Sequence, residues 1–145
     1  FGCTVTALSS STSKKTQALQ LGARHFHGLD PATLQAQENT LDFLLVTASN
    51  DQDWERAIAL LRPHGTLCFA GMPGPVTLDI AAMTYKTLTV STANVGGRHD
   101  MLKMLEFASE HHVWPLVDIF PTAQINQALD ALRNNTVRYR AVIEF

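Results

Sequence analysis

A dense run of hydroxyl and cationic side chains lies near the start of the chain. Three serines, Ser9, Ser10 and Ser11, follow a β-branched stretch at residues 4–8, and Lys14 comes three positions later. Hydroxyl and ammonium groups donate hydrogen bonds to an anion, whereas a carboxylate would repel it. Since no Asp or Glu occurs in this run, it predicts a loop that binds a phosphate group. A solvated serine-rich turn with an ordinary helix cap is the alternative.

The elements around this loop follow a regular order. Short β-branched stretches alternate with helical patterns along the whole sequence, which predicts an α/β fold with a mostly parallel sheet and flanking helices. The nearly continuous apolar stretch 42–47 predicts a central strand that is covered on both faces. Strands are expected over residues 4–8, 25–27, 42–47, 66–70, 87–91, 116–120 and 139–145, and the expected helix N-caps are Ser13, Asp30, Asn50 or Asp51, and Thr122.

Four loops of this fold are candidates for binding a ligand. In an open α/β sheet, ligands lie beyond the carboxyl ends of the strands. The loops that follow residues 8, 47, 70 and 91 are therefore expected at one edge of the sheet. The serine and lysine run belongs to the first of them.

The composition limits the expected number of domains and the expected binding partners. The chain has 145 residues, 46% of them hydrophobic and 17% charged, which favours one globular domain with a core. Its net charge of -2 gives no field that would select nucleic acid or an anionic membrane, so neither partner is expected. Cys3 and Cys68 lie in apolar, strand-like stretches and are expected to be buried, reduced thiols in a cytoplasmic protein.

The sequence shows no pattern typical of a metal site. The two cysteines are far apart and neither has the spacing of zinc ligands. His25 and His27 would share one face of a short strand without a third ligand, and the adjacent His111 and His112 point to different sides of a helix. No metal ligand and no catalytic residue is therefore assigned in this chain.

The run that opens the chain also carries a resemblance. Residues 5–15, Val-Thr-Ala-Leu-Ser-Ser-Ser-Thr-Ser-Lys-Lys, followed by Ala-Leu-Gln-Leu-Gly-Ala at 18–23, resemble the cinnamyl alcohol dehydrogenase-like branch of the medium-chain dehydrogenase/reductase family. The resemblance continues through 67–73, 96–101 and 137–142 and covers essentially the whole chain. It implies a Rossmann-type sheet, NADP as cofactor, and an intact protein that transfers hydride between NADPH and a small alcohol or aldehyde at a zinc ion.

The same resemblance implies contacts to each part of the cofactor. Ser9, Ser10 and Lys14 would hold the 2′-phosphate with Ser11 nearby, and Arg140, rather than its neighbour Arg138, would reach the diphosphate. The adenine side would be bordered by Thr47, Ala48 and Ser49, and the nicotinamide would be lined by Gly71, Met72, Thr92, Ala93 and Asn94.

The chain also departs from the family pattern. It lacks the Gly-x-Gly-x-x-Gly turn of the first βα unit and the preceding catalytic domain with its zinc ligands. The chain is therefore interpreted as a fragment that is inactive alone. Residues 1–115 are expected to form a truncated NADP-binding Rossmann domain, and residues 116–145 a segment that returns to the missing catalytic domain. Open strand edges and uncovered apolar faces predict a homo-oligomer.

Three other functions are considered. A zinc-free quinone reductase-like enzyme would share the cofactor domain, and a stand-alone nucleotide-binding or interaction module would perform no chemistry. An S-adenosylmethionine methyltransferase is disfavoured, because that fold usually places an acidic residue where Ser9, Ser10 and Ser11 lie.

Overall fold

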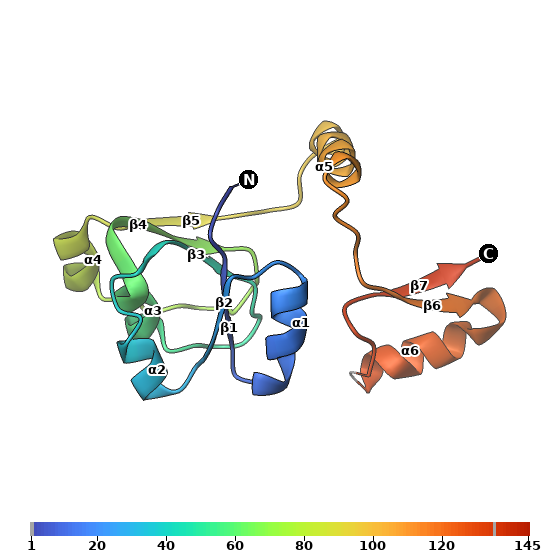
Figure 1. The fold of residues 1–145 in the computed structure, drawn as a ribbon, viewed down its shortest axis with the longest axis horizontal. Helices are drawn as coiled ribbons and strands as arrows, with labels where there is room; N and C mark the ends of the chain where they lie inside the picture. Colours follow the sequence, from blue (N-terminus) through green and yellow to red (C-terminus); the bar gives the residue numbers. More distant parts are fainter. Residues whose placement is uncertain (1, 135) are drawn as a thin grey trace. The chain divides into compact units, whose positions relative to one another are not determined.

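The computed structural model of the chain describes residues 2–134 and 136–145. The chain divides into two compact units, here called the first unit (Phe1–Asn94) and the second unit (Val95–Phe145). In the described residues, each recorded strand pair is parallel and helices connect the strands, as Figure 1 shows. The predicted α/β, Rossmann-like class is confirmed.

The first unit contains two parallel sheets. β1 pairs with β2, and β3, β4 and β5 form a three-stranded sheet with β4 in the middle. Its elements are β1 (Thr6–Ser9), the 3₁₀ turn η1 (Thr12–Lys14), α1 (Lys15–Gln20), β2 (His25–Gly28), α2 (Pro31–Gln35), β3 (Leu41–Val46), α3 (Trp54–Leu60), β4 (Leu61–Phe69), α4 (Ile80–Lys86) and β5 (Thr89–Thr92).

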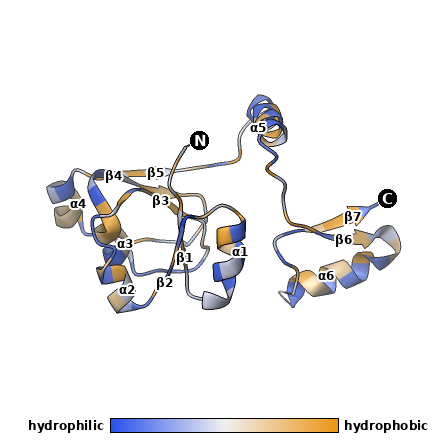
Figure 2. Cartoon of the chain, viewed as in Figure 1, coloured by the Kyte–Doolittle hydropathy of each residue, from blue (hydrophilic) through white to orange (hydrophobic). Residues whose placement is uncertain are grey.

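A compact apolar core joins α3 to β3 and β4. Val46, Trp54, Leu61 and Leu67 are buried together, and the Trp54 ring lies 5.3 Å from the ring of Phe69. Figure 2 shows the hydrophobic colouring along β3 and much of α3. These contacts remove large side chains from water and hold α3 against the sheet.

β3 is not the doubly covered central strand that its apolar sequence predicts. It lies at the edge of its sheet, with β4 as its recorded neighbour, and Phe43 and Leu45 are 54% and 51% exposed. The alternate residues Leu44 and Val46 face the core. The prediction was wrong for one face because no described element covers Phe43 and Leu45 there.

The junction between α3 and β4 depends on a lysine from a helix that the sequence pattern did not predict. α3 ends at Leu60 and β4 begins at the next residue, so the last helical carbonyls lack partners within the helix. Lys86 Nζ, at the end of α4, donates to the carbonyls of Ile58, Ala59 and Leu61 at 3.2, 3.0 and 2.8 Å. Asp79 caps the start of α4, since its carboxylate accepts the N–H groups of Ala81 and Ala82.

The predicted helix caps have mixed outcomes. Asp30 caps α2 as expected, since its Oδ1 accepts the Thr33 N–H at 2.9 Å. The α3 prediction was wrong: Asp53, not Asn50 or Asp51, accepts the N–H of Arg56. Among the described residues, the Ser13 side chain does not cap α1, whose N-cap residue is Lys14. Thr122 does not cap a helix either, because its hydroxyl donates to the Glu144 carbonyl.

The second unit contains one long helix and a small αβ layer. Its elements are α5 (Arg98–Glu110), β6 (Asp118–Pro121), the 3₁₀ turn η2 (Thr122–Gln124), α6 (Ile125–Arg133) and β7 (Ala141–Glu144). β6 pairs with β7 with Asp118 opposite Ala141, and α6 buries Ala128. Ile119 of β6 is paired with Val142 of β7, and both side chains are exposed. This small sheet therefore has an uncovered apolar face.

The cysteines and the apolar segments give two further findings. Cys68 is buried as predicted, but Cys3 is exposed because it precedes β1 and lies outside the core. Within the described residues, no helix has the length and apolar character needed to cross a membrane.

Replacing Lys86 tests the α3–β4 junction. Lys86→Met keeps the aliphatic stem but removes the ammonium donor that the three carbonyl groups share, although those of Ile58 and Ala59 keep a backbone donor. We expect a loss of about 1–3 kcal/mol in the free energy of unfolding. Urea denaturation of the chain measures this loss. Lys103→Met removes an exposed lysine from α5 and serves as the control; equal effects of the two substitutions would contradict the structural role of Lys86.

The α2 cap predicts a pH dependence. Hydrogen bonds from the Thr33 side chain and backbone lower the pKa of Asp30 from its ordinary value of 3.8. A lowered pKa means that the cap stabilises the fold above pH 3.8 and that this stabilisation disappears as the pH falls through the folded-state pKa. The difference in stability between the original chain and Asp30→Ala should therefore be present at neutral pH and shrink below pH 3.8. Denaturation curves over this range test it, and a constant difference would refute it.

Candidate functional site

The carboxyl ends of β3, β4 and β5 lie at one edge of the three-stranded sheet. The Val46 carbonyl accepts the N–H groups of both Ala70 and Gly71 at 2.9 Å. The Ala93 N–H donates to the Phe69 carbonyl at 2.8 Å. The structure therefore brings three of the four predicted loops together, those that follow β3, β4 and β5.

Gly71 lies unusually close to the loop after β3. A Cβ atom on Gly71 would lie 2.2 Å from the carbonyl oxygen of Ala48 and 2.8 Å from the carbonyl carbon of Thr47. Real Cβ atoms do not approach backbone atoms this closely, so any larger residue would displace the loop. The two loops can cross here only because position 71 has no side chain.

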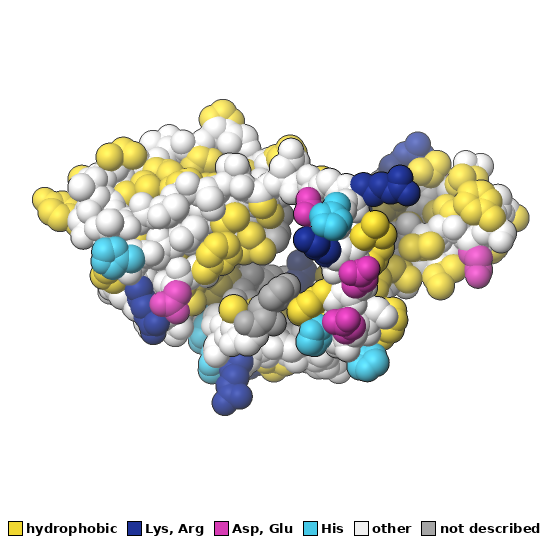
Figure 3. Space-filling view, turned by 90° about the horizontal axis from the view of Figure 1, so that it is seen from above, with side chains coloured by type: hydrophobic (Ala, Val, Ile, Leu, Met, Phe, Trp, Pro, Cys, Tyr) yellow, Lys and Arg dark blue, Asp and Glu magenta, His cyan; other side chains and the backbone are white. Residues whose placement is uncertain are grey.

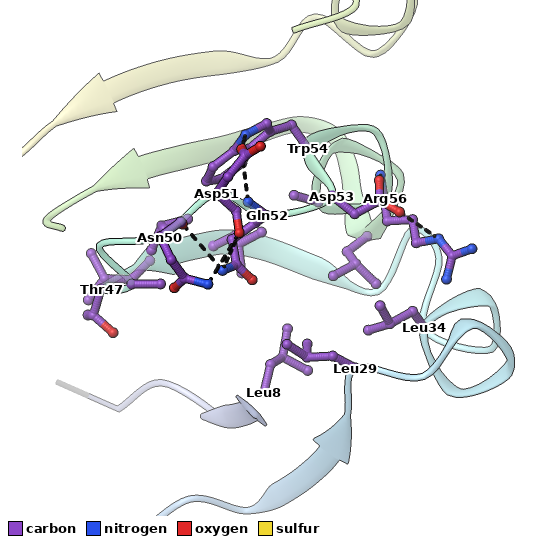
Figure 4. Close-up of a pocket in the computed structure, with 16 residues that line it drawn as sticks. Leu8, Leu29, Leu34, Thr47, Asn50, Asp51, Gln52, Asp53, Trp54 and Arg56 are labelled. Carbon is purple, nitrogen blue, oxygen red and sulfur yellow. Dashed lines mark hydrogen bonds and ion pairs between the residues drawn. The ribbon is translucent and has the colours of Figure 1, made fainter. Parts of the chain in front are cut away.

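A cavity of about 450 Å³ lies beside this edge, within the first unit. Figure 4 shows its walls and its polar rim. Its apolar lining includes Leu8, Leu29, Leu34, Leu44 and Val46, from β1, the end of β2, α2 and β3. Its polar rim follows β3 and includes Thr47, Asn50, Asp51, Gln52 and Asp53. A cavity with apolar side chains on one side and polar groups on the other can hold a partly apolar small molecule.

Hydrogen bonds fix the rim. Asp51 Oδ1 accepts the Trp54 indole N–H at 2.7 Å and the Gln52 backbone N–H at 3.0 Å. Gln52 Nε2 donates to the Asp51 carbonyl at 2.9 Å, and Asp53 forms an ion pair with Arg56 at 3.0 Å. The rim is therefore ordered by its own contacts and by the buried tryptophan.

The loop formed by residues 9–14, here called the serine loop, begins at the border of the cavity. Leu8 lines the cavity, and Ser9 follows it directly. Ser9 Oγ accepts the Ser11 N–H at 3.2 Å, and the hydroxyls of Ser11 and Ser13 share a hydrogen bond of 2.7 Å. Ser10 and Lys14 are exposed. The loop thus presents hydroxyl groups and a cation to solvent.

The predicted cofactor residues are only partly brought together. Thr47 and Ala48 line the cavity, whereas Met72 is 84% exposed beyond it. Thr92, Ala93 and Asn94 are exposed at the end of β5, and Arg140 belongs to the second unit. The sequence analysis missed the rim residues 50–53; the polar run Asn-Asp-Gln-Asp shortly after the apolar strand was the available signal.

Charged side chains and potential metal ligands are dispersed in the described residues. In Figure 3, acidic, basic and histidine side chains are interspersed with hydrophobic ones on the visible face. Across residues 2–134 and 136–145 there is no group of three or more His, Cys, Asp or Glu side chains that could hold a metal ion. The rings of His25 and His27 stack with centroids 6.4 Å apart, on one face of β2 as predicted.

Comparison with known proteins identifies the family. Residues 1–110 match the zinc-binding dehydrogenase family. The chain belongs to this family. It is 35% identical to the probable formaldehyde dehydrogenase AdhA of Bacillus subtilis over 99% of this chain and 42% of that protein. It is 32% identical to the NADP-dependent alcohol dehydrogenase C of Mycobacterium bovis, again over 99% of this chain and 42% of that protein.

A solved structure supports the fold of this family member and the predicted branch. The cinnamyl alcohol dehydrogenase SbCAD4 of Sorghum bicolor matches with a TM-score of 0.88 and 36% identity, over 98% of this chain and 41% of that one. The predicted resemblance to the cinnamyl alcohol dehydrogenase-like branch is confirmed. The chain spans about two fifths of the length of these relatives and matches their C-terminal part.

The crossing at Gly71 gives a testable prediction. Gly71→Ala should lower the free energy of unfolding by about 1–3 kcal/mol, because its Cβ would overlap the backbone of Ala48. Gly97→Ala is the matched control, since its Cβ would lie 3.6 Å from the nearest atom, an ordinary contact. Thermal denaturation compares the two variants, and an equally stable Gly71→Ala chain would show that the loops do not cross so closely.

Proposed function

We propose that the whole protein is an NADP-dependent alcohol dehydrogenase or aldehyde reductase and that this chain supplies much of its cofactor site. In such a reaction, the alcohol carbon gives a hydride to the cofactor and the hydroxyl group loses a proton, which yields the aldehyde and NADPH. Family membership and relatives named as an alcohol dehydrogenase, an aldehyde reductase and a probable formaldehyde dehydrogenase support the reaction class. The substrate class is therefore small alcohols and aldehydes.

The serine loop after β1 carries the argument for NADP. In a dinucleotide-binding sheet, a carboxylate at this strand end binds the ribose hydroxyls of NAD, and a 2′-phosphate would be repelled by it. Here Ser9 and Ser11 lie at this position, with the exposed Lys14 three residues further on. Hydroxyl and ammonium donors fit a 2′-phosphate, and the relative from Mycobacterium bovis is named as NADP-dependent.

The remaining cofactor contacts are part of the same proposal. The cavity beside Thr47 and Ala48 would receive the adenine, and the apolar walls and ordered rim suit a flat, partly apolar ring. Gly71, Met72 and the loop 92–94 would border the nicotinamide, and Arg140 would bind the diphosphate. We propose that residues 1–115 form the cofactor domain and that residues 116–145 return to the catalytic domain of a homo-oligomeric, cytoplasmic enzyme.

The residues that the structure describes do not fit a zinc site. The described residues contain no cluster of potential metal ligands. We therefore propose that the zinc expected from the family is held by a part of the protein that this chain does not span. The contribution of the chain would be to bind and orient the cofactor, and we expect no catalysis from the chain alone.

Lys14→Ala tests the proposed 2′-phosphate contact. In the full-length protein, the loss of one charge-assisted hydrogen bond should weaken NADPH binding about 10- to 100-fold and leave NADH binding nearly unchanged. Fluorescence titration with both cofactors measures the two affinities. Lys15→Ala is the matched control, because the neighbouring lysine is also exposed. Equal losses for the two cofactors, or no loss at all, would contradict the assignment of Lys14.

A further inference from the structure

The short segment that carries Arg138 and Arg140 is fixed at both ends. Thr136 donates its backbone N–H and its hydroxyl to the Ala131 carbonyl of α6 at 2.9 and 3.1 Å. At the other end, the backbone N–H of Asp118 in β6 donates to the Arg140 carbonyl at 2.8 Å. The segment 136–140 is thus anchored to a helix and to a strand, although its arginines are exposed.

The middle of this segment has a disfavoured backbone conformation. Tyr139 has a φ of 71°, and the Arg140 N–H donates to the Arg138 carbonyl at 3.1 Å, which closes a γ-turn. A residue with a Cβ atom stays at positive φ only where its surroundings hold it there. The Tyr139 side chain is 56% exposed, so burial of its ring does not explain the conformation.

Asp118 supplies the missing constraint. Its Oδ2 accepts the backbone N–H of Arg138 at 2.9 Å, and its own N–H binds the Arg140 carbonyl. One partly buried residue therefore holds both sides of the γ-turn, 20 positions away in the sequence. Because Arg140 directly follows Tyr139, the turn sets the direction in which the Arg140 side chain leaves the backbone.

We propose that Asp118 is a positioning residue that fixes the backbone from which the Arg140 side chain leaves, an inference that rests on the proposed function, in which Arg140 binds the cofactor diphosphate. Without the Asp118 carboxylate, the Arg138 N–H loses this acceptor, Tyr139 relaxes toward negative φ, and the Cα–Cβ bond of Arg140 changes direction. A carboxylate that faced the diphosphate would repel it. The charge of Asp118 is instead directed at a backbone N–H, which allows an acidic residue to support an anion site.

A double-mutant cycle in the full-length protein tests this proposal. Asp118→Ala and Arg140→Ala should each weaken NADPH binding by about tenfold or more, because each removes the oriented guanidinium contact. The double variant should bind no more weakly than Arg140→Ala alone. Asp118→Asn should bind nearly normally, since its amide oxygen still accepts the Arg138 N–H. Asp130→Ala, which removes an exposed aspartate paired with Arg133 in the same unit, is the control.

A second variant separates positioning from folding. Glycine adopts positive φ readily, so in a Tyr139→Gly background the replacement Asp118→Ala should weaken NADPH binding less than it does in the original protein. Melting temperatures of all variants are measured alongside. Loss of binding that follows loss of stability, with no rescue by glycine, would overturn the positioning role.

The remaining outcomes are also decisive. Additive losses in the cycle, or normal binding by Asp118→Ala, would overturn the proposal, while NADPH binding by the unaltered protein and its dependence on Lys14 would leave the proposed function intact. Normal binding by Arg140→Ala would overturn both this proposal and the diphosphate contact assigned to Arg140. If the unaltered full-length protein binds no NADPH, the proposed function fails and the proposal fails with it.

Discussion

The candidate site in the first unit depends on the parallel pairing of β3 with β4. The Val46 carbonyl at the end of β3 accepts two successive N–H groups from the end of β4, so one oxygen atom fixes the start of both loops. Trp54, Leu61 and Leu67 pack behind this point and keep the strands in register. The absence of a side chain at Gly71 then lets the loops approach to a distance that no other residue allows.

Local spacing made part of the fold predictable. Asp30 followed by Pro31 marks a helix start from sequence alone, because an N-cap acts on a backbone group three residues later. The alternation of strands and helices likewise predicted four loops at one sheet edge, and the structure brings the three after β3, β4 and β5 together. At Asn50-Asp51-Gln52-Asp53 the sequence offered several equivalent caps. The buried Trp54 indole needs an acceptor and takes Asp51, which leaves Asp53 as the cap.

Contacts between distant residues could not be predicted in this way. Lys86 meets the end of α3 from 25 to 28 positions away, and nothing in its own surroundings distinguishes it from the other lysines. The bond between Asp118 and Arg138 is also a product of the fold, since it requires β6 and β7 to be paired. The exposure of Phe43 and Leu45 has the same origin, because an apolar stretch does not specify which element covers each of its faces. The rim of the cavity was missed for a related reason: its polar residues become a site only beside Leu8 and Leu34 from other elements.

Cofactor selectivity in the proposed site is a difference between two affinities. The serine hydroxyls can donate to a phosphate, but they can also bond to a free ribose hydroxyl, so alone they discriminate weakly between NADPH and NADH. An exposed lysine adds an electrostatic attraction to the phosphate, which NADH lacks, and this attraction weakens as the ionic strength rises. The absence of a carboxylate also favours NADPH, since it removes the bidentate partner that the ribose of NADH would gain. The hydroxyls are held in place by bonds among Ser9, Ser11 and Ser13 and would supply geometry in the proposed site. Lys14 would supply most of the preference, which is therefore expected to decline as salt is added.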